Sequence, residues 1–365
     1  AGRAVVDPGG RSEEKGMSVV RQNVGKTTDG KEISLYTVTN KNGAVMKVTD
    51  FGAILVSVIV PDREGRPTDV VLGFDSGEDY QLKNTPHFGA TIGRNGNRID
   101  QSSFLLNGEK VQLTPNENEN NLHSGPVGYD LMMWEGREAE NGVAFHRISP
   151  DGEQGFPGTF DVTVTYTLTE DNAVEIHYEG TCDRDTVANM TNHSYFNLGG
   201  HASGSVCGQL IQLNASRYTP VIDSKSIPTG EIAPVAGTPM DFREPRVIGE
   251  EIDADFEQLQ MTGGYDHNFV LDKSSDGMEW MARACCRENG IYMEAFTDRP
   301  GVQFYTGNFI DGEVGKEGTV YAKRQGFCLE SQYFPNSVND PNFAHPFLKA
   351  GEKYDTRTMY RFSVR

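Results

Sequence analysis

The chain has 365 residues, of which 36% are hydrophobic, 10% aromatic and 23% charged, a composition typical of soluble globular proteins. Its 52 acidic and 33 basic residues give a formal net charge of −19, which disfavours nucleic acids and anionic membranes as partners. The longest apolar segment, residues 53–60, is shorter than the roughly 18 apolar residues that a membrane span requires. We therefore expect a soluble protein with neither a nucleic acid nor a membrane as its partner.

The N-terminal segment, residues 1–16, is polar, glycine-rich and charged, and it has no hydrophobic period. This composition predicts a disordered leader. Beyond it, no linker, repeat or low-complexity run divides the chain. Because all-β sandwiches often exceed the usual domain length, we predict that residues 17–365 form a single domain.

Short segments with period-two alternation follow along the chain, and each predicts a strand. The clearest is 160–169, where apolar residues alternate with Asp161 and four threonines. Asp171-Asn172 then supplies a turn and the alternation resumes over 174–178, which predicts a β-hairpin. Further strands are predicted at Ile33–Val38, Val45–Val48, Ile54–Val60 and Ile291–Phe296. Since no long amphipathic helical period is present, the fold is predicted to be all-β, a large antiparallel β-sandwich with long connecting loops.

The five cysteines have no regular spacing, and none forms a C-x-x-C pair, so free thiols in a reducing compartment are predicted. Three Asn-x-Ser/Thr sequences occur, at Asn189, Asn192 and Asn214. The first two lie in or beside a segment with candidate site residues, where a glycan would obstruct the site. We therefore expect a cytoplasmic protein, with a bacterial periplasm as the alternative if a signal peptide has been removed.

Six segments are polar and aromatic at once and too irregular to be plain strands. They are Gly93–Ile99, Asn120–Gly125, Thr191–Leu198, Gly264–Asn268, Pro300–Phe304 and Cys328–Gln332. Sugar hydroxyls need bidentate polar partners, and the apolar face of a pyranose ring needs an aromatic platform. Taken one at a time, each segment has a simpler interpretation as a cap or bridge at the edge of the sandwich, so it is their combination that indicates a sugar site.

In their order along the chain, these segments resemble the aldose 1-epimerases, the galactose mutarotase family. The most specific motifs are Thr-Asn-His-Ser-Tyr-Phe-Asn-Leu at 191–198 and Leu-Glu-Ser-Gln at 329–332. Further matching segments are Asp50–Ala53, Asp69–Phe74, Pro335–Asn339 and Gly351–Tyr354. The resemblance implies a β-sandwich of the galactose mutarotase type and an isomerase that interconverts the α and β anomers of a free hexose such as galactose or glucose. It implies no metal and no organic cofactor.

Position by position, the resemblance implies that His193 is the general acid and Glu330 the general base. It implies substrate contacts by six further residues: Asn97, Arg98, His123, Tyr195, Asp266 and Gln303. The chemistry fits these residue types, because opening a hemiacetal needs a base at the anomeric hydroxyl and an acid at the ring oxygen. Histidine titrates near neutral pH, and partial burial raises the pKa of a carboxyl group toward that range.

The chain departs from the family pattern at four positions. The family usually has Ala at Gly96, Gly at Ser124, Thr at Ser331, and often a neutral residue at Arg299. No departure removes a proposed catalytic group, but Ser124 and Arg299 could shift which sugar is preferred. The remaining histidines show no metal-ligand spacing and have no predicted role.

Several alternatives stay open at this point. A non-catalytic carbohydrate-binding module would bind sugar without turnover. A glycoside hydrolase using Glu330 and Asp266 needs two carboxylates roughly 5–9.5 Å apart. A hexose-6-phosphate 1-epimerase needs a basic cluster at the C6 end of the sugar, for which Arg299 is the one hint. A purely structural sandwich has no particular support. The expected partner is a monosaccharide, and the expected state is a monomer or weak dimer.

Overall fold

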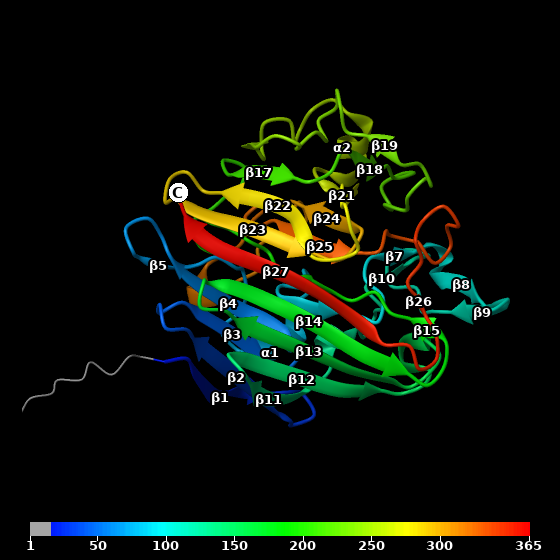
Figure 1. Cartoon of the computed structure of the whole chain (residues 1–365), viewed down its shortest axis with the longest axis horizontal. Helices are drawn as coiled ribbons and strands as arrows, with labels where there is room; N and C mark the ends of the chain where they lie inside the picture. The colour runs from blue at the N-terminus through cyan, green and yellow to red at the C-terminus, as the bar shows by residue number, and fades with distance from the viewer. Residues whose placement is uncertain (1–15) are drawn as a thin grey trace, which may run out of the picture.

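The computed structural model of the chain describes residues 16–365 (Figure 1). The predicted disordered leader, residues 1–16, lies outside the described residues except for its last position. In the described part, strands prevail and pair antiparallel in all three large sheets, which confirms the predicted all-β antiparallel fold. The described helices are short: α1 (Gly77–Leu82), α2 (Glu257–Thr262) and 3-10 turns at Asp100–Ser102, Tyr129–Leu131, Glu153–Gly155 and Lys316–Gly318. Neither α1 nor α2 has the length that a membrane-crossing helix needs.

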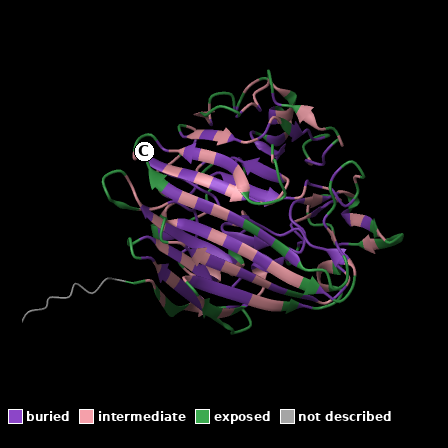
Figure 2. Ribbon diagram, viewed as in Figure 1, coloured by how far each residue is buried: buried purple, intermediate pink, exposed green. Residues whose placement is uncertain are grey.

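The largest sheet has nine strands. In spatial order they are β11 (Glu135–Ala139), β12 (Gly142–Ser149), β13 (Phe160–Leu168), β14 (Ala173–Cys182), β27 (Tyr354–Val364), β23 (Ile291–Thr297), β22 (Glu279–Cys285), β17 (Leu210–Leu213) and β20 (Arg246–Val247). The predicted hairpin is β13–β14, and the predicted strand at 291–296 is β23. Along β13 the apolar residues are buried and the residues between them are partly or fully exposed, which Figure 2 shows as alternating bands.

Two five-stranded sheets lie behind it. The first, with three strands predicted from the sequence, contains β1 (Ser18–Lys26), β2 (Glu32–Thr39), β3 (Val45–Thr49), β4 (Ile54–Pro61) and β5 (Pro67–Asp69). The second contains β19 (Ala233–Pro234), β18 (Arg217–Thr219), β21 (Asp266–Val270), β24 (Gly301–Tyr305) and β25 (Cys328–Gln332). Two-stranded ladders complete the described strands: β6 (Ala90–Ile92) with β16 (Thr191–His193), β7 (Arg98–Ile99) with β10 (Asn121–Leu122), β8 (Ser103–Leu106) with β9 (Glu109–Gln112), and β15 (Thr186–Val187) with β26 (Phe347–Leu348).

One hydrophobic core joins the three large sheets. It includes Met46 of β3, Val164 of β13 and Phe304 of β24, all without exposed surface. Burying apolar side chains of this size contributes roughly 1.5–3 kcal/mol each. The core therefore fixes the second five-stranded sheet, which carries part of the candidate site, against the large sheet.

A buried arginine anchors the segment that leads into the site. Arg94 has no exposed surface, and its guanidinium donates hydrogen bonds to the carbonyl oxygens of Ser149, Pro157 and Gly158 and to the hydroxyl of Thr186. These acceptors lie in or beside the connection between β12 and β13 or on β15. Because a guanidinium presents five donors in a fixed fork, it can tie these elements together at once. The backbone that follows, including Asn97 and Arg98, is thereby held in place.

Candidate active site

A cavity of about 330 Å³ opens between the second five-stranded sheet and the ladders β6–β16 and β7–β10. This volume lies at the lower end of the range of ligand pockets, roughly 300–1,000 Å³, and suits a monosaccharide. All eight predicted site residues line it: Asn97, Arg98, His123, His193, Tyr195, Asp266, Gln303 and Glu330. The lining also includes residues without a predicted role: Thr85, Pro86, His87, Glu117, Leu122, Tyr305, Phe309, Ile310 and Glu313.

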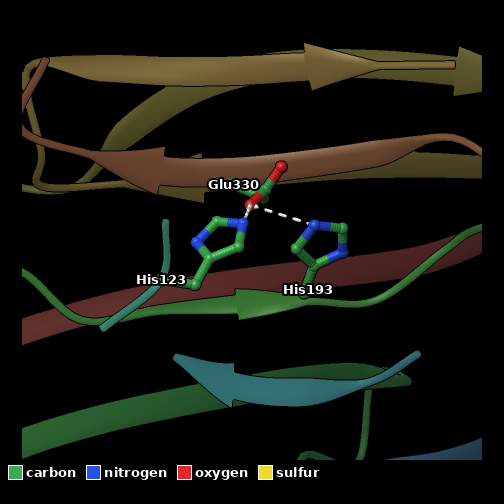
Figure 3. A group of neighbouring side chains, drawn as sticks. All are labelled: His123, His193 and Glu330. Carbon is green, nitrogen blue, oxygen red and sulfur yellow. Dashed lines mark ion pairs between the residues drawn. The ribbon is translucent and has the colours of Figure 1, made fainter. Parts of the chain in front are cut away.

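His193 and Glu330 face each other in this cavity (Figure 3). His193 ends β16 and Glu330 is the central residue of β25, and Nε2 of the histidine lies 3.4 Å from Oε1 of the glutamate. Both side chains are at least 93% buried, and Oε1 has no hydrogen-bond partner among the described residues. Burial, reinforced by the charge of Asp266, raises the pKa of Glu330 well above its usual value. Burial also lowers the pKa of His193 to about 3. An unpartnered buried carboxyl group is costly to stability, so its presence indicates a functional role.

His123 completes the group drawn in Figure 3. The backbone N–H of Asn97 donates to its Nδ1 over 2.9 Å, so Nε2 carries the proton of the neutral ring and lies 3.9 Å from Glu330 Oε1. Burial and the neighbouring His87 and His193 lower its pKa well below the usual value. One ligand atom each from His123, His193 and Glu330 lies within 4.8 Å of the others, a spacing that a single cation could bridge. The metal-free reaction implied by the resemblance stays a prediction.

Amides and carboxyl groups form the wall on the Glu330 side. Gln303 stands opposite Glu330 in the β24–β25 register, and its amide donates to Asp266 Oδ1 over 2.9 Å. The amide of Gln332 donates in turn to Gln303 Oε1 over 3.0 Å. Burial raises the pKa of Asp266, although the nearby Arg98 opposes this. The network holds these groups in fixed rotamers, which is the preorganisation that hydroxyl recognition requires.

Arg98 lies on β7 and pairs with Glu117 in a bidentate arrangement, with Nε–Oε1 and Nη2–Oε2 distances of 2.6 and 3.3 Å. Its backbone N–H donates to the side-chain oxygen of Asn97 over 2.9 Å. The Asn97 amide also approaches Gln332 Oε1 at 3.4 Å. Both predicted contacts therefore line the cavity, but each is already tied to neighbouring protein groups.

Aromatic side chains form another wall. Tyr195 donates its hydroxyl to the Pro86 carbonyl over 2.7 Å, so it offers the cavity its ring rather than its hydroxyl. That ring lies 5.1 Å from the His193 ring and 5.9 Å from the Tyr305 ring, centroid to centroid. Phe309 stacks near Tyr305 and is 67% exposed. These rings provide the apolar platform expected for a pyranose.

His87 lines the cavity, although no sequence motif predicts a role for it. Its ring lies 5.2 Å from His123 and 5.6 Å from His193, and its Nδ1 lies 3.0 Å from Oδ2 of the buried Asp130. It stands just before β6, which pairs with the strand of His193. No local motif marks it, because the pairing that brings it to the site joins segments about a hundred residues apart.

Two residues expected to influence sugar preference do not line the cavity. The hydroxyl of Ser124 accepts from the Asn95 N–H and donates to its carbonyl, which makes it a local tie between loops. Arg299 pairs with Asp298 and donates to the Tyr333 hydroxyl. The hint of a C6 phosphate site at Arg299 is therefore wrong. Among the described residues lining the cavity, Arg98 is the one Lys or Arg, and Glu117 neutralises it.

A histidine beside a buried carboxyl group, with a polar wall and an aromatic wall around them, is an arrangement that suits an enzyme acting on small carbohydrates. A family model described as aldose 1-epimerase matches residues 34–361. The chain is 45% identical over 318 residues to galactose mutarotase from Homo sapiens, covering 87% of this chain and 90% of that protein. It is 40% identical over 337 residues to aldose 1-epimerase from Escherichia coli, covering 92% and 96%. The structure is similar to galactose 1-epimerase from Lactobacillus acidophilus, with a TM-score of 0.83, 26% identity and coverage of 95% and 99%.

The chain belongs to the aldose 1-epimerase family. It is therefore an isomerase with the galactose mutarotase fold, as the sequence motifs predicted. A similar aldose epimerase homologue from C. elegans has a TM-score of 0.82 at 30% identity and covers 89% of this chain and 97% of its own.

Proposed function

We propose that this enzyme interconverts the α and β anomers of free hexoses such as galactose and glucose, with His193 as general acid and Glu330 as general base. The observation that carries the proposal is the approach of His193 Nε2 to Glu330 Oε1, 3.4 Å apart in a cavity of monosaccharide size. A sugar whose C1 faces this pair has its anomeric hydroxyl near the carboxylate and its ring oxygen near the imidazole.

The reaction conserves protons within the pair. Glu330 takes the proton of the C1 hydroxyl, His193 gives a proton to the ring oxygen, and the bond between C1 and that oxygen breaks to leave an open-chain aldehyde. The aldehyde end turns about the C1–C2 bond. The C5 hydroxyl then attacks the other face of C1 and returns its proton to His193, while Glu330 returns the first proton to the oxygen on C1. No other reactant is consumed.

The opposite pKa shifts of the two groups suit this exchange. Burial disfavours both charged forms, because it raises the pKa of Glu330 and lowers that of His193. A proton passed from Glu330 to His193 yields the imidazolium and carboxylate that ring opening needs. Hydrogen bonds from the sugar to Glu330, whose Oε1 has no partner among the described groups, favour this charged arrangement once substrate binds.

The test is polarimetric. Freshly dissolved α-D-galactose and α-D-glucose are followed to their equilibrium rotation with wild type, His193→Ala and Glu330→Ala. Each general acid or base contributes roughly 10²–10⁴-fold, so we expect both variants to fall close to the spontaneous rate. His146→Ala, on the outer side of β12 and away from the cavity, serves as the matched control and is expected to keep full activity. Failure of the wild type to accelerate either sugar would contradict the proposal.

We further propose that the enzyme works as a monomer or weak dimer. We also propose that it works in a reducing compartment, which we take to be the cytoplasm. Residues of one chain supply both catalytic groups and the walls of the cavity. All five cysteines are free. Asn189 and Asn192 are each 2% exposed, so a glycan at either would disrupt the fold. Size-exclusion chromatography with light scattering tests the oligomeric state.

A further inference from the structure

His87 occupies a strained turn that presents its ring to the cavity. The residue lies between α1 and β6, its backbone φ of 64° falls in the left-handed region, and its side chain is 30% exposed. The turn is closed by hydrogen bonds from the His87 N–H to the Asn84 carbonyl and from the Ala90 N–H to the His87 carbonyl. A left-handed conformation in a non-glycine residue costs free energy, and such residues cluster at ligand sites.

Asp130 fixes the tautomer of this histidine. Its side chain is 3% exposed, and its carboxylate accepts a hydrogen bond from His87 Nδ1 over 3.0 Å. Because Nδ1 carries the proton in this pair, Nε2 of the neutral ring has a free lone pair. Nε2 has no hydrogen-bond partner among the described residues. His87 therefore offers the cavity a hydrogen-bond acceptor.

The cavity has two chemically different sides. Glu330, Gln303 and Asp266 form one, linked by the β24–β25 register and the Gln303–Asp266 hydrogen bond. The other is made of imidazoles, because the ring of His87 contacts those of His123 and His193. In the pyranose ring, C1 is bonded to C2 and to the ring oxygen. The ring oxygen is also bonded to C5, which carries C6. With C1 at Glu330 and the ring oxygen at His193, the hydroxyls from C2 onward face the carboxyl side and C6 faces the imidazole side.

We propose that Nε2 of His87, oriented by Asp130, accepts a hydrogen bond from the C6 hydroxyl of the sugar and so selects hexoses with a free C6 hydroxyl. This inference rests on the proposed function, which assigns C1 to Glu330 and the ring oxygen to His193. A 6-deoxyhexose lacks the donor. A 6-phosphate ester would replace this donor with negative charge near Asp130, and no unpaired Lys or Arg among the described lining residues would compensate.

The test compares kcat/KM for mutarotation of D-galactose and of 6-deoxy-D-galactose in wild type, His87→Phe and His87→Gln. Wild type is expected to prefer D-galactose by about 5- to 20-fold, the usual effect of losing one hydrogen bond to a partly buried acceptor. His87→Phe should reduce the preference to about 1. His87→Gln keeps an acceptor and should restore part of it; glutamine is tolerated in the left-handed region elsewhere in this chain, at Gln101 and Gln154. Because the preference is a ratio within one sample, incomplete folding of a variant does not affect it.

The outcomes separate this inference from the function on which it rests. If wild type accelerates D-galactose mutarotation but His87→Phe keeps the wild-type preference, or loses activity on both sugars equally, His87 does not contact C6 and the inference is overturned. If wild type accelerates neither sugar, the proposed function itself is wrong, and so is the inference that rests on it. His146→Phe, on the outer side of the large sheet, should keep the wild-type preference.

Discussion

The side chains of the hairpin β13–β14 and those of the cavity are buried to a similar extent, but burial has opposite consequences for the stability of the two regions. In the hairpin, Val162, Val164 and Tyr166 have no exposed surface, and their burial stabilises the fold. In the cavity, His193 and Glu330 are almost as deeply buried, yet burial disfavours their charged forms. Burial in the sheets therefore stabilises the fold, whereas burial in the cavity disfavours the charged forms of the two groups for which we propose catalytic roles.

The largest expected effect is on activity. Glu330→Gln keeps the shape of the side chain but cannot take the C1 proton, so kcat should fall by roughly 10²–10⁴-fold. Since Oε1 of Glu330 has no partner among the described residues, the free energy of unfolding should stay constant or rise. Polarimetry and denaturant unfolding measure the two quantities. A variant that loses stability along with activity would contradict this expectation, because Glu330 would then support the fold as well.

A substitution in the core of the large sheet should lower stability and leave activity unchanged. Val164→Ala removes two buried methyl groups from the core and should lower the free energy of unfolding by about 2 kcal/mol. The kcat/KM per folded molecule should not change, because Val164 does not line the cavity. Urea unfolding monitored by circular dichroism, together with assays well below the unfolding transition, checks both statements. A several-fold loss of kcat/KM would show that the two regions are coupled.

The pH dependence of stability should show how burial in the cavity affects the two titratable groups. The unfolded state binds a proton at His193 below about pH 6.5, whereas the folded state does so only near pH 3, so this residue makes stability rise with pH between those limits. Glu330 acts in the opposite direction, because its folded-state pKa is raised and stability falls as pH increases above about 4.5. Between pH 4.5 and 6.5 the two contributions oppose each other. Removing the histidine with His193→Gln should change the slope by about −1.4 kcal/mol per pH unit near pH 4.5 and by about half of that near pH 6.5.

Unfolding free energies of wild type and His193→Gln at several pH values between 4.5 and 6.5 provide the measurement. Equal slopes for the two proteins would mean that His193 titrates normally in the folded state.

The smallest effect is expected at a polar group inside the sheet. The hydroxyl of Tyr178, on β14, is buried without a hydrogen-bond partner among the described residues. Tyr178→Phe removes this hydroxyl and should raise the free energy of unfolding by up to about 1 kcal/mol, with no change in kcat. Thermal unfolding resolves a shift of this size. A clear loss of stability would show instead that the Tyr178 hydroxyl has a hydrogen-bond partner.

Local patterns predicted the fold where period-two alternation is visible in the sequence. The β13–β14 hairpin is the best example, since the valines and the tyrosine of β13 alternate with threonines. The long strand β27 was not predicted, because its inward positions include the threonines Thr356 and Thr358, which hide the apolar period. The predicted single domain for residues 17–365 stays a prediction.

The eight predicted site residues came from motifs of a known family, and they line one cavity. The His87–Asp130 pair was missed because its partners lie 43 residues apart and no motif joins them. Only the ladder between β6 and β16 brings His87 beside His193. Likewise, nothing in the sequence indicated that Arg299 would turn to Asp298 and Tyr333, away from the cavity.

The left-handed backbone at His87, Asn97 and His123, with φ values of 64°, 61° and 53°, limits how this site can diverge in evolution. Glycine adopts this conformation without cost, and asparagine, aspartate and histidine adopt it more often than other residues, whereas for β-branched residues it is an outlier. Single substitutions to valine, isoleucine or threonine at these positions are therefore expected to strain the backbone of the site. New sugar preferences are expected to arise instead at lining residues with ordinary backbone, such as Thr85 and Phe309.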